Sequence, residues 1–248
     1  MPLIEISKLS FSYDTEPIVS DASLSIEPAS IISLLGPSGC GKSTLLRLIA
    51  GLEIPLAGQI KFAAIPTCSP SDSLRLLFQD YDAYPWFTVQ DNIRFGSGPK
   101  PFPSVTATQE MLDRVGLSAS AKRYPAELSG GMKKRLGLAR CLIRCPSLML
   151  LDEPFSSLDF EAKCEMYDLV QKLRAENQST VLMVTHDVHE AILLSDQILI
   201  SSVKPLHIVD VVEVPFGRYR DDTIIDTSEY RDIRHHITNA FHRSSISR

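Results

Sequence analysis

The stretch GPSGCGKST, residues 36–44, has the residue types and the spacing needed to hold phosphate. Its glycines let successive backbone N–H groups converge on phosphate oxygens, Lys42 would neutralise the outer phosphates, and the Ser43 hydroxyl would ligate Mg²⁺. The alternative is an ordinary strand-to-helix turn in which the glycines serve geometry alone. We predict a nucleotide-binding loop, made of Gly36, Pro37, Ser38, Gly39, Cys40, Gly41, Lys42, Ser43 and Thr44.

Two adjacent acids, Asp152 and Glu153, follow the apolar run SLMLL, and His186 follows the apolar run TVLMVT. Side chains at the C-terminal ends of parallel strands lie where such sheets bind ligands. One acid would hold Mg²⁺ through water, while the other would orient and deprotonate an attacking water. Alone, an acid pair often caps the next helix, and a lone histidine is usually structural. Both predictions therefore depend on the loop at 36–44.

A sheet is needed to position these groups, and the sequence supplies its strands. The runs LIEISKLSFSY and ASLSI alternate apolar and polar residues, which is typical of antiparallel strands with one open face. IISLL, SLMLL and TVLMV are continuous and apolar, as strands buried on both faces are. LLRLIA has helical spacing and ends at Gly51, a C-terminal cap. We predict an α/β fold with a parallel sheet and an N-terminal antiparallel β subdomain.

The composition excludes several classes of protein. A chain of 248 residues with 44% hydrophobic and 22% charged residues is an ordinary globular one. Its net charge of −5 argues against nucleic acid as the main partner. Five cysteines without a CxxC pair suggest neither a disulfide framework nor a zinc site, and a reducing cytosol fits best. The N-terminus does not resemble a secretion signal, and no apolar run approaches the ~20 residues of a membrane helix.

Two adjacent glycines precede a predicted helix in LSGGMKKRLGLAR, residues 128–140, although glycine destabilises a helix there. Taken with the loop, the acid pair and the histidine, LSGGM resembles the signature sequence of the ATP-binding-cassette ATPases. The resemblance covers about residues 3–200. It implies a P-loop NTPase core and a head-to-tail dimer. Ser129, Gly130 and Gly131 would face the partner's ATP, and Asp159 in SSLD would contact the partner's phosphate loop.

The resemblance assigns the remaining roles by position. Glu153 would be the general base, and His186 would hold the γ-phosphate and the attacking water. Ser43, Gln79 and Asp152 would hold Mg²⁺, and Gln79 would also link the site to a membrane partner. Tyr13 would stack on adenine, although it could equally be a strand tyrosine packed against a loop.

Four residues after the glycine pair depart from the family or invite another reading. Met132 stands where the family usually has glutamine, so a polar contact toward the ribose would be lost and closure weakened; it could also be a packing residue. Lys133, Lys134 and Arg135 spread over most of a helical turn, which favours a solvated face over a nucleic-acid site. The buried stripe of this helix would be formed by Leu136, Ala139 and Ile143.

The resemblance also divides the single domain. A core with the β subdomain would span about 1–78 and 146–215, an inserted helical subdomain about 80–145, and a C-terminal tail about 216–248, too short for an added regulatory β-domain. YDAYPWFTVQDNI resembles the subgroup that serves importers of nitrate, taurine and alkanesulfonates. Residues 80–87 would line a groove for a helix of the membrane partner; otherwise they form a hinge whose aromatics, Trp86 among them, are buried internally.

The function that this resemblance implies is an ATPase subunit of an importer. It would dimerise on ATP with itself or a related subunit, with ATP and Mg²⁺ as its cofactors. It would drive a transmembrane permease that takes up a small anionic solute from an external binding protein. It would lie at the cytoplasmic side of the inner membrane and would not bind nucleic acid. The alternatives are a soluble ATP-dependent clamp and a regulatory cassette that barely hydrolyses ATP. The chain has no long insertion or second cassette, which favours the importer.

Overall fold

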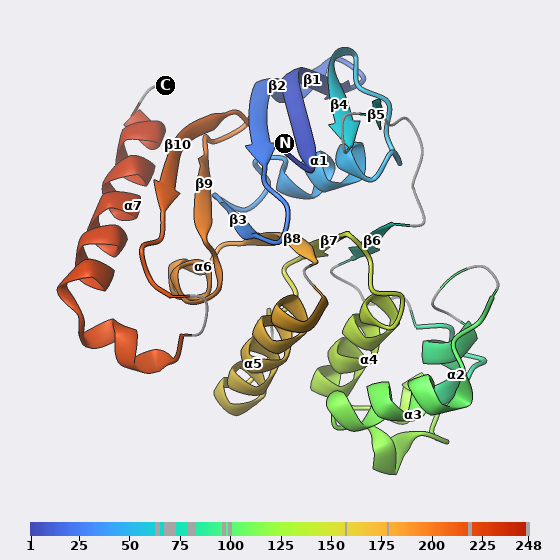
Figure 1. The fold of residues 1–248 in the computed structure, drawn as a ribbon. Helices are drawn as coiled ribbons and strands as arrows, with labels where there is room; N and C mark the ends of the chain where they lie inside the picture. The colour runs from blue at the N-terminus through green and yellow to red at the C-terminus, as the bar shows by residue number, and fades with distance from the viewer. Residues whose placement is uncertain are drawn as a thin grey trace.

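Two sheets form the frame of the molecule (Figure 1). The computed structural model describes residues 1–62, 65–66, 73–78, 83–95, 98, 101–156, 158–177, 179–217 and 220–246. Within them, a four-stranded sheet has the order β2-β1-β4-β5 and a six-stranded sheet has the order β10-β9-β3-β8-β7-β6.

The smaller sheet is antiparallel and is built from the N-terminal strands. Its members are β1 (Ile4–Tyr13), β2 (Glu16–Ile26), β4 (Ala57–Phe62) and β5 (Ile65–Pro66). The alternating side chains of β1 and β2 turn their apolar members, such as Ile4, Ile6 and Leu9, into a core shared with the larger sheet. The predicted antiparallel β subdomain is confirmed.

The larger sheet is parallel except for β10, which runs antiparallel to β9. Its strands are β3 (Ile31–Leu35), β6 (Leu74–Leu77), β7 (Leu148–Asp152), β8 (Thr180–Thr185), β9 (Gln197–Ser201) and β10 (Ile208–Glu213). Every residue of β3, β7 and β8 is buried. Alternate residues of β7 contribute to different cores, which explains why its sequence is apolar throughout.

Helices cover both faces of this sheet. Those of the described residues are α1 (Lys42–Ile49), α2 (Val89–Phe95), α3 (Val105–Arg114), α4 (Gly130–Leu142), α5 (Phe160–Asn177), α6 (Val188–Leu194) and α7 (Ser228–Ile246). Helix α1 lies between the two sheets, whereas α4 and α5 cover the opposite face of the parallel sheet (Figure 1). Helices α2 to α4 occur in the chain between β6 and β7, which are neighbouring strands.

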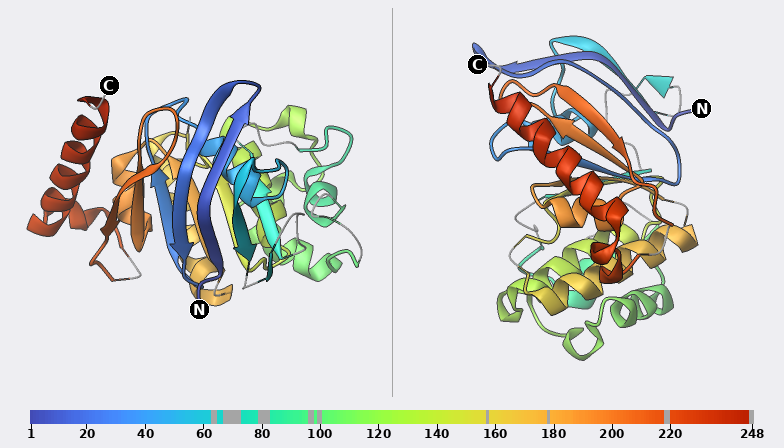
Figure 2. Two further views of the ribbon diagram at one scale, coloured as in Figure 1. Left: turned by 90° about the horizontal axis from the view of Figure 1, so that it is seen from above. Right: turned by 90° about the vertical axis from the view of Figure 1, so that its left-hand side faces the viewer.

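The C-terminal helix α7 lies against the edge of the parallel sheet (Figure 2). Its apolar face, including Ile233 and Ile237, packs on α6 and β9 and reaches the core that contains Leu35, the last residue of β3. The ring of His189 on α6 bonds to the Tyr230 hydroxyl at 3.0 Å through Nδ1 and to Asp222 at 3.1 Å through Nε2. Helix α6 is therefore joined to the tail by polar as well as apolar contacts.

The prediction of a solvated face at residues 133–135 is wrong for Lys134. Its side chain lies inside the protein, with only 7% of the residue exposed. Helix α4 is covered on one side by β7 and α5 and on another by the turn that follows Glu153, and Lys134 points at that turn, where Ser156 accepts a hydrogen bond from it. Helical periodicity locates the apolar stripe but does not reveal a second covered side.

The loop between β3 and α1 is held by close packing at two glycines. At Gly41 the backbone has φ +115°, and a Cβ there would lie 2.8 Å from the carbonyl oxygen of Ile18 in β2. At Gly36 a Cβ would lie 1.9 Å from the Ser201 hydroxyl at the end of β9. The loop is thus wedged between segments that are far away in the sequence.

Gly41→Ala is expected to lower the free energy of unfolding by about 3 kcal/mol, because a left-handed backbone and a clash with backbone act together. Gly39→Ala is the matched control: Gly39 also has a positive φ, +76°, but no described residue lies within 4 Å of its Cβ position, so the expected loss is only about 1 kcal/mol. Urea denaturation of both variants measures the difference. Equal losses would show that the packing against Ile18 contributes nothing.

Candidate active site

Lys42 begins α1 and turns its side chain back over the loop that precedes it. The ammonium donates hydrogen bonds to the carbonyl oxygens of Gly36 at 2.8 Å and Pro37 at 2.7 Å, and the residue is buried. These two carbonyls fix the cation beside the N–H groups at the start of the helix. The arrangement concentrates positive potential in the loop, which suits an anion such as phosphate.

Asp152 ends β7 beside this loop and is buried with one oxygen lacking a partner. Within the described residues, its Oδ1 has no hydrogen bond, while Ser43 bonds to the carboxyl group. Burial raises the pKa of Asp152; the Ser43 hydrogen bond opposes that rise, and the Glu153 charge adds to it. A buried oxygen without a donor, next to a serine hydroxyl, is the donor set that a hard cation such as Mg²⁺ prefers.

Glu153 follows directly and has a left-handed backbone, φ +47°. Its N–H donates to the Val184 carbonyl at 3.0 Å, and its Oε1 lies 3.2 Å from Nδ1 of His186, whose side chain is 57% exposed. The carboxylate borders two hollows of about 430 Å³ each. One contains Lys42 and Ser43; the other contains His186. Glu153 is the residue that connects them.

An ionic cluster around the buried Glu190, not predicted from the sequence, lines the second hollow. Glu190 of α6 accepts hydrogen bonds from Lys163 Nζ at 2.7 Å, Thr185 Oγ1 at 2.7 Å and the Tyr167 hydroxyl at 3.2 Å. Burial opposes the charge of Lys163, but the hydrogen bond and charge of Glu190 raise its pKa overall. Glu190 lies in α6, which begins after His186, and its partners Lys163 and Tyr167 come from α5, so no local pattern in the sequence indicated it.

The glycine pair and Asp159 do not line either hollow. Ser129 caps α4, with its hydroxyl accepting from Met132 N at 3.3 Å, and neither it nor Gly130 or Gly131 lines the hollows around Glu153. A Cβ at Gly130 would meet nothing within 4 Å. Asp159 accepts a bond from Ala162 N at 2.9 Å and so caps α5. The structure of one chain does not bring these residues to Lys42.

Tyr13 likewise does not line the hollow of the phosphate loop. Its hydroxyl donates to Glu53 at 3.0 Å, and its ring meets Phe11 edge-on at 4.8 Å. Ile18 and Lys204 line that hollow instead, and neither residue was predicted from the sequence. Gln79, together with residues 80–82, lies outside the described residues.

The aromatic segment after residue 82 is partly exposed. Trp86 is 67% exposed, and the Arg140 guanidinium stacks over the ring of Tyr84 at 4.8 Å. A hollow of about 380 Å³ adjoins them, lined by Leu76, Leu77, Phe78, Tyr84, Gly137, Arg140 and Cys141. The alternative in which Trp86 fills a core gap is therefore wrong.

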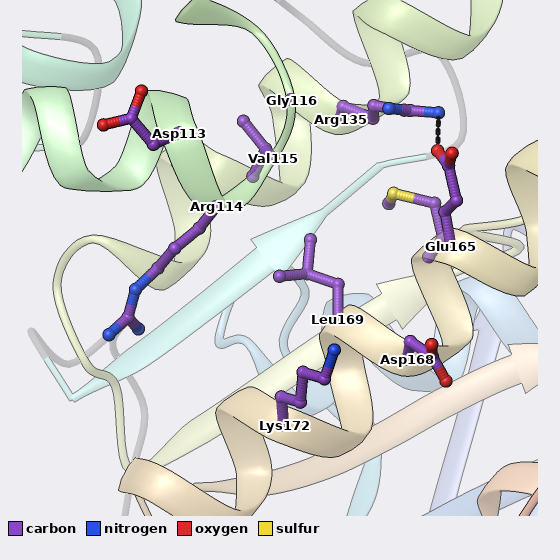
Figure 3. Close-up of a pocket in the computed structure, with 10 residues that line it drawn as sticks. Asp113, Arg114, Val115, Gly116, Arg135, Glu165, Asp168, Leu169 and Lys172 are labelled. Carbon is purple, nitrogen blue, oxygen red and sulfur yellow. Dashed lines mark hydrogen bonds and ion pairs between the residues drawn. The ribbon is translucent and has the colours of Figure 1, made fainter.

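A further hollow of about 310 Å³ separates the end of α3 from α5 (Figure 3). Charges of both signs surround it, and Arg135 of α4 pairs with Glu165 of α5 at its rim. None of the predicted site residues lines it. This hollow is a charged groove between helices, and the predicted catalytic residues lie instead around Glu153.

Comparisons of the sequence with known proteins all identify transporter ATP-binding proteins as its relatives. Residues 19–156 match the family model described as ABC transporter. The aliphatic sulfonates import ATP-binding protein SsuB 2 of Burkholderia lata is 37% identical, covering 89% of this chain and 80% of that protein. The taurine import ATP-binding protein TauB of Escherichia coli K12 is 37% identical, covering 87% and 86%. The nitrate import ATP-binding protein NrtC of Synechococcus elongatus is 40% identical, covering 89% of this chain but 35% of that protein.

The fold is similar to that of a solved cassette dimer. A dimeric structure of a post-hydrolysis state of the ATP-binding cassette MJ0796, bound to ADP and Pi, superposes with a TM-score of 0.74 at 25% identity. The match covers 86% of this chain and all of that one.

Asp152→Asn is expected to stabilise the chain in buffer with EDTA and no nucleotide, by on the order of 1 kcal/mol at pH 7, because it removes a buried charge with an unpartnered oxygen. Below about pH 4, the ordinary pKa of an aspartate, Asp152 is protonated both folded and unfolded, so the advantage vanishes. As pH rises, the unfolded chain ionises first and the wild type loses stability, while the variant does not.

Urea unfolding between pH 4 and pH 7 measures this difference, with Asp232→Asn, an exposed acid on α7, as the control. An Asp152→Asn chain that is less stable than the wild type at pH 7, or a difference that does not change with pH, would contradict the cost assigned to burying the Asp152 carboxylate.

Proposed function

This chain belongs to the ABC transporter family, and from that premise we propose that it is the subunit that binds and hydrolyses ATP to drive an importer. The family resemblance predicted from the phosphate loop and LSGGM is confirmed, as is the fold of an ATP-binding cassette. The observation that carries the catalytic proposal is the position of Glu153, which borders both the hollow of Lys42 and that of His186.

The residues around Glu153 suit hydrolysis of a phosphoanhydride. The N–H groups of residues 36–44 and the Lys42 ammonium would hold the phosphates. Glu153 would accept the proton of a water whose oxygen attacks the γ-phosphorus, while the bond to the β–γ bridging oxygen breaks and ADP leaves. His186, in contact with Glu153 at 3.2 Å, would hold that water and the γ-phosphate. Positioning and charge stabilisation supply most of the rate in such sites.

Mg²⁺ fits the donor set beside the loop. Ser43 and Asp152 would hold it, with Gln79 as the further ligand that the family resemblance implies. The unpartnered Oδ1 of Asp152 supports this assignment. When bound, the ion offsets the negative charge of the phosphates and of the developing leaving group.

A second subunit would complete the site. Ser129, Gly130, Gly131 and Asp159 would contact nucleotide and phosphate loop in the partner, either a copy of this chain or a related subunit. None of them lines the hollows around Glu153, and no described residue lies within 4 Å of a Cβ at Gly130, which supports that role. Tyr13 would stack on adenine, since its ring, partly exposed in this structure, presents an apolar face.

The membrane partner would be a permease. No helix among the described residues is long and apolar enough to cross a bilayer. Exposed Trp86 and the hollow beside Tyr84 support docking of a permease helix there. The relatives named for import of sulfonates, taurine and nitrate support a small anionic solute, delivered by an external binding protein. The chain would then lie peripherally, at the cytoplasmic side of the inner membrane.

The proposed cassette has three parts. The core with the β subdomain spans about 1–78 and 146–215, the helical subdomain about 80–145 and the tail about 216–248. Support comes from the order of the elements, because α2 to α4 interrupt the chain between two strands that pair.

Glu153→Gln is expected to lower kcat for Mg·ATP hydrolysis by about 100-fold or more, because the proton acceptor is lost. ATP affinity should stay within about twofold, since the phosphate loop is unchanged. Steady-state ATPase assays and nucleotide titration measure the two effects, with the exposed Glu161→Gln of α5 as the control. Undiminished turnover in Glu153→Gln would exclude Glu153 as the base.

The importer itself is tested by its partner. Tagged Glu153→Gln chain, incubated with ATP and Mg²⁺, is purified from detergent-solubilised source membranes, and the co-purifying proteins are identified by mass spectrometry. A permease with several membrane spans supports the proposal and begins to identify the solute. Recovery of soluble partners alone would overturn it in favour of an ATP-dependent clamp.

Met132→Gln is expected to tighten the ATP-dependent dimer of the Glu153→Gln chain by about tenfold, because an amide regains a polar contact toward the nucleotide ribose. Met132 is a partly buried residue packed against the core of α4 and α5, so Met132→Leu is the control that keeps the packing. Sedimentation equilibrium measures the dimer. A weaker dimer with Gln than with Leu would show that packing alone determines this position.

A further inference from the structure

The buried Lys134 ends a chain of hydrogen bonds that leads to the backbone of Glu153. Its ammonium donates to Ser156 Oγ at 3.3 Å. The Ser156 hydroxyl donates to the carbonyl oxygen of Glu153 at 3.0 Å, and the Ser156 N–H donates to the same oxygen at 3.2 Å. The side chain of a helix residue thus reaches the main chain of the proposed base through one intermediate.

The backbone of Glu153 needs such support. A non-glycine residue with φ +47° adopts a conformation that costs about 1 kcal/mol or more, and it persists only where its surroundings hold it. The N–H is fixed by Val184 of β8, and the carbonyl is fixed by Ser156. These bonds decide the direction in which the Glu153 carboxylate leaves the chain.

Lys134 also belongs electrostatically to the site. Burial lowers the pKa of its ammonium, Lys163 acts in the same direction, and the carboxylates of Glu190 and Glu153 oppose it. A lysine is buried at this cost only where acids or hydrogen-bond acceptors compensate it. The ionic cluster around Glu190 and the turn at Ser156 provide both.

Its neighbour in the helix behaves differently. Arg135 turns toward α5 and pairs with Glu165, at the hollow shown in Figure 3. The packing of α4 against α5 therefore has an ion pair of its own, which does not involve Glu153. The inward Lys134 contact is separate from it.

We propose that Lys134 is a positioning residue for ATP hydrolysis, which acts through Ser156 on the backbone of Glu153. The inference rests on the proposed function, in which Glu153 is the base. Helix α4 begins at Ser129 and the glycine pair, the residues proposed to contact the partner's ATP, and Lys134 lies about one turn further along. The hydrogen-bonded link therefore connects the helix that would contact the partner's ATP with the proposed base of the chain's own site.

The test compares Lys134→Met, Ser156→Ala and the double variant in steady-state Mg·ATP hydrolysis by the full chain, with Lys133→Met as the matched control on the same helix. Each single variant is expected to lower kcat by about tenfold with KM within about twofold of the wild type. The double variant should be no slower than the slower single variant, because both changes break one link. Lys133→Met should keep kcat within about twofold.

Three results would overturn the inference: a kcat in Lys134→Met close to that of the wild type, a change confined to KM, or effects of the single variants that multiply in the double. A thermal melt shows whether each variant folds. If Lys134→Met does not fold, Ser156→Ala carries the test, because it removes one hydroxyl and leaves the lysine in place.

Glu153→Gln, assayed beside these variants, distinguishes a failure of the positioning role from a failure of the proposed function. If turnover depends on Glu153 and not on Lys134 or Ser156, only the positioning role fails. If turnover does not depend on Glu153, the proposed function fails first.

Discussion

Leu35 of β3 pairs with Thr185 of β8, and Asp152 of β7 pairs with Val184 of the same strand. Because these strands are parallel, their ends meet at one edge, and the residues that follow them come together there. Each strand is buried on both faces, so a shift by one residue would exchange the two cores and displace the site with them. The positions of Lys42, Glu153 and His186 therefore depend on the apolar packing of these strands.

The edge of the sheet is also where the chain buries charge. Glu190 and Lys163 line the same hollow as Glu153 and His186. Glu190 accepts hydrogen bonds from Lys163, Thr185 and Tyr167, and Lys134 donates one to Ser156. Buried ions contribute little net stability, but they tolerate few arrangements, because each displaced partner leaves a costly charge. These contacts therefore restrict the directions in which Glu153 and His186 can move.

Much of this could be predicted from the sequence, since continuous apolar runs predict strands buried on both faces and the residues after them predict the site. The phosphate loop, the acid pair and the histidine all belong to such local patterns. Lys134 could not be predicted, because helical spacing describes one apolar stripe and says nothing of a turn that covers a second side. The role of Glu190 could not be predicted either, because it depends on contacts between α6 and α5, which are far apart in the chain.

Helix α7 covers the core that contains Leu35, the residue directly before the phosphate loop, and it is bonded to α6, which begins two residues after His186. The tail thus supports both the phosphate loop after β3 and the segment that carries His186. A stop codon within the last helix would spare each proposed catalytic residue, yet it would uncover the support of both segments. Its genetic phenotype would therefore resemble that of a lesion in the site itself.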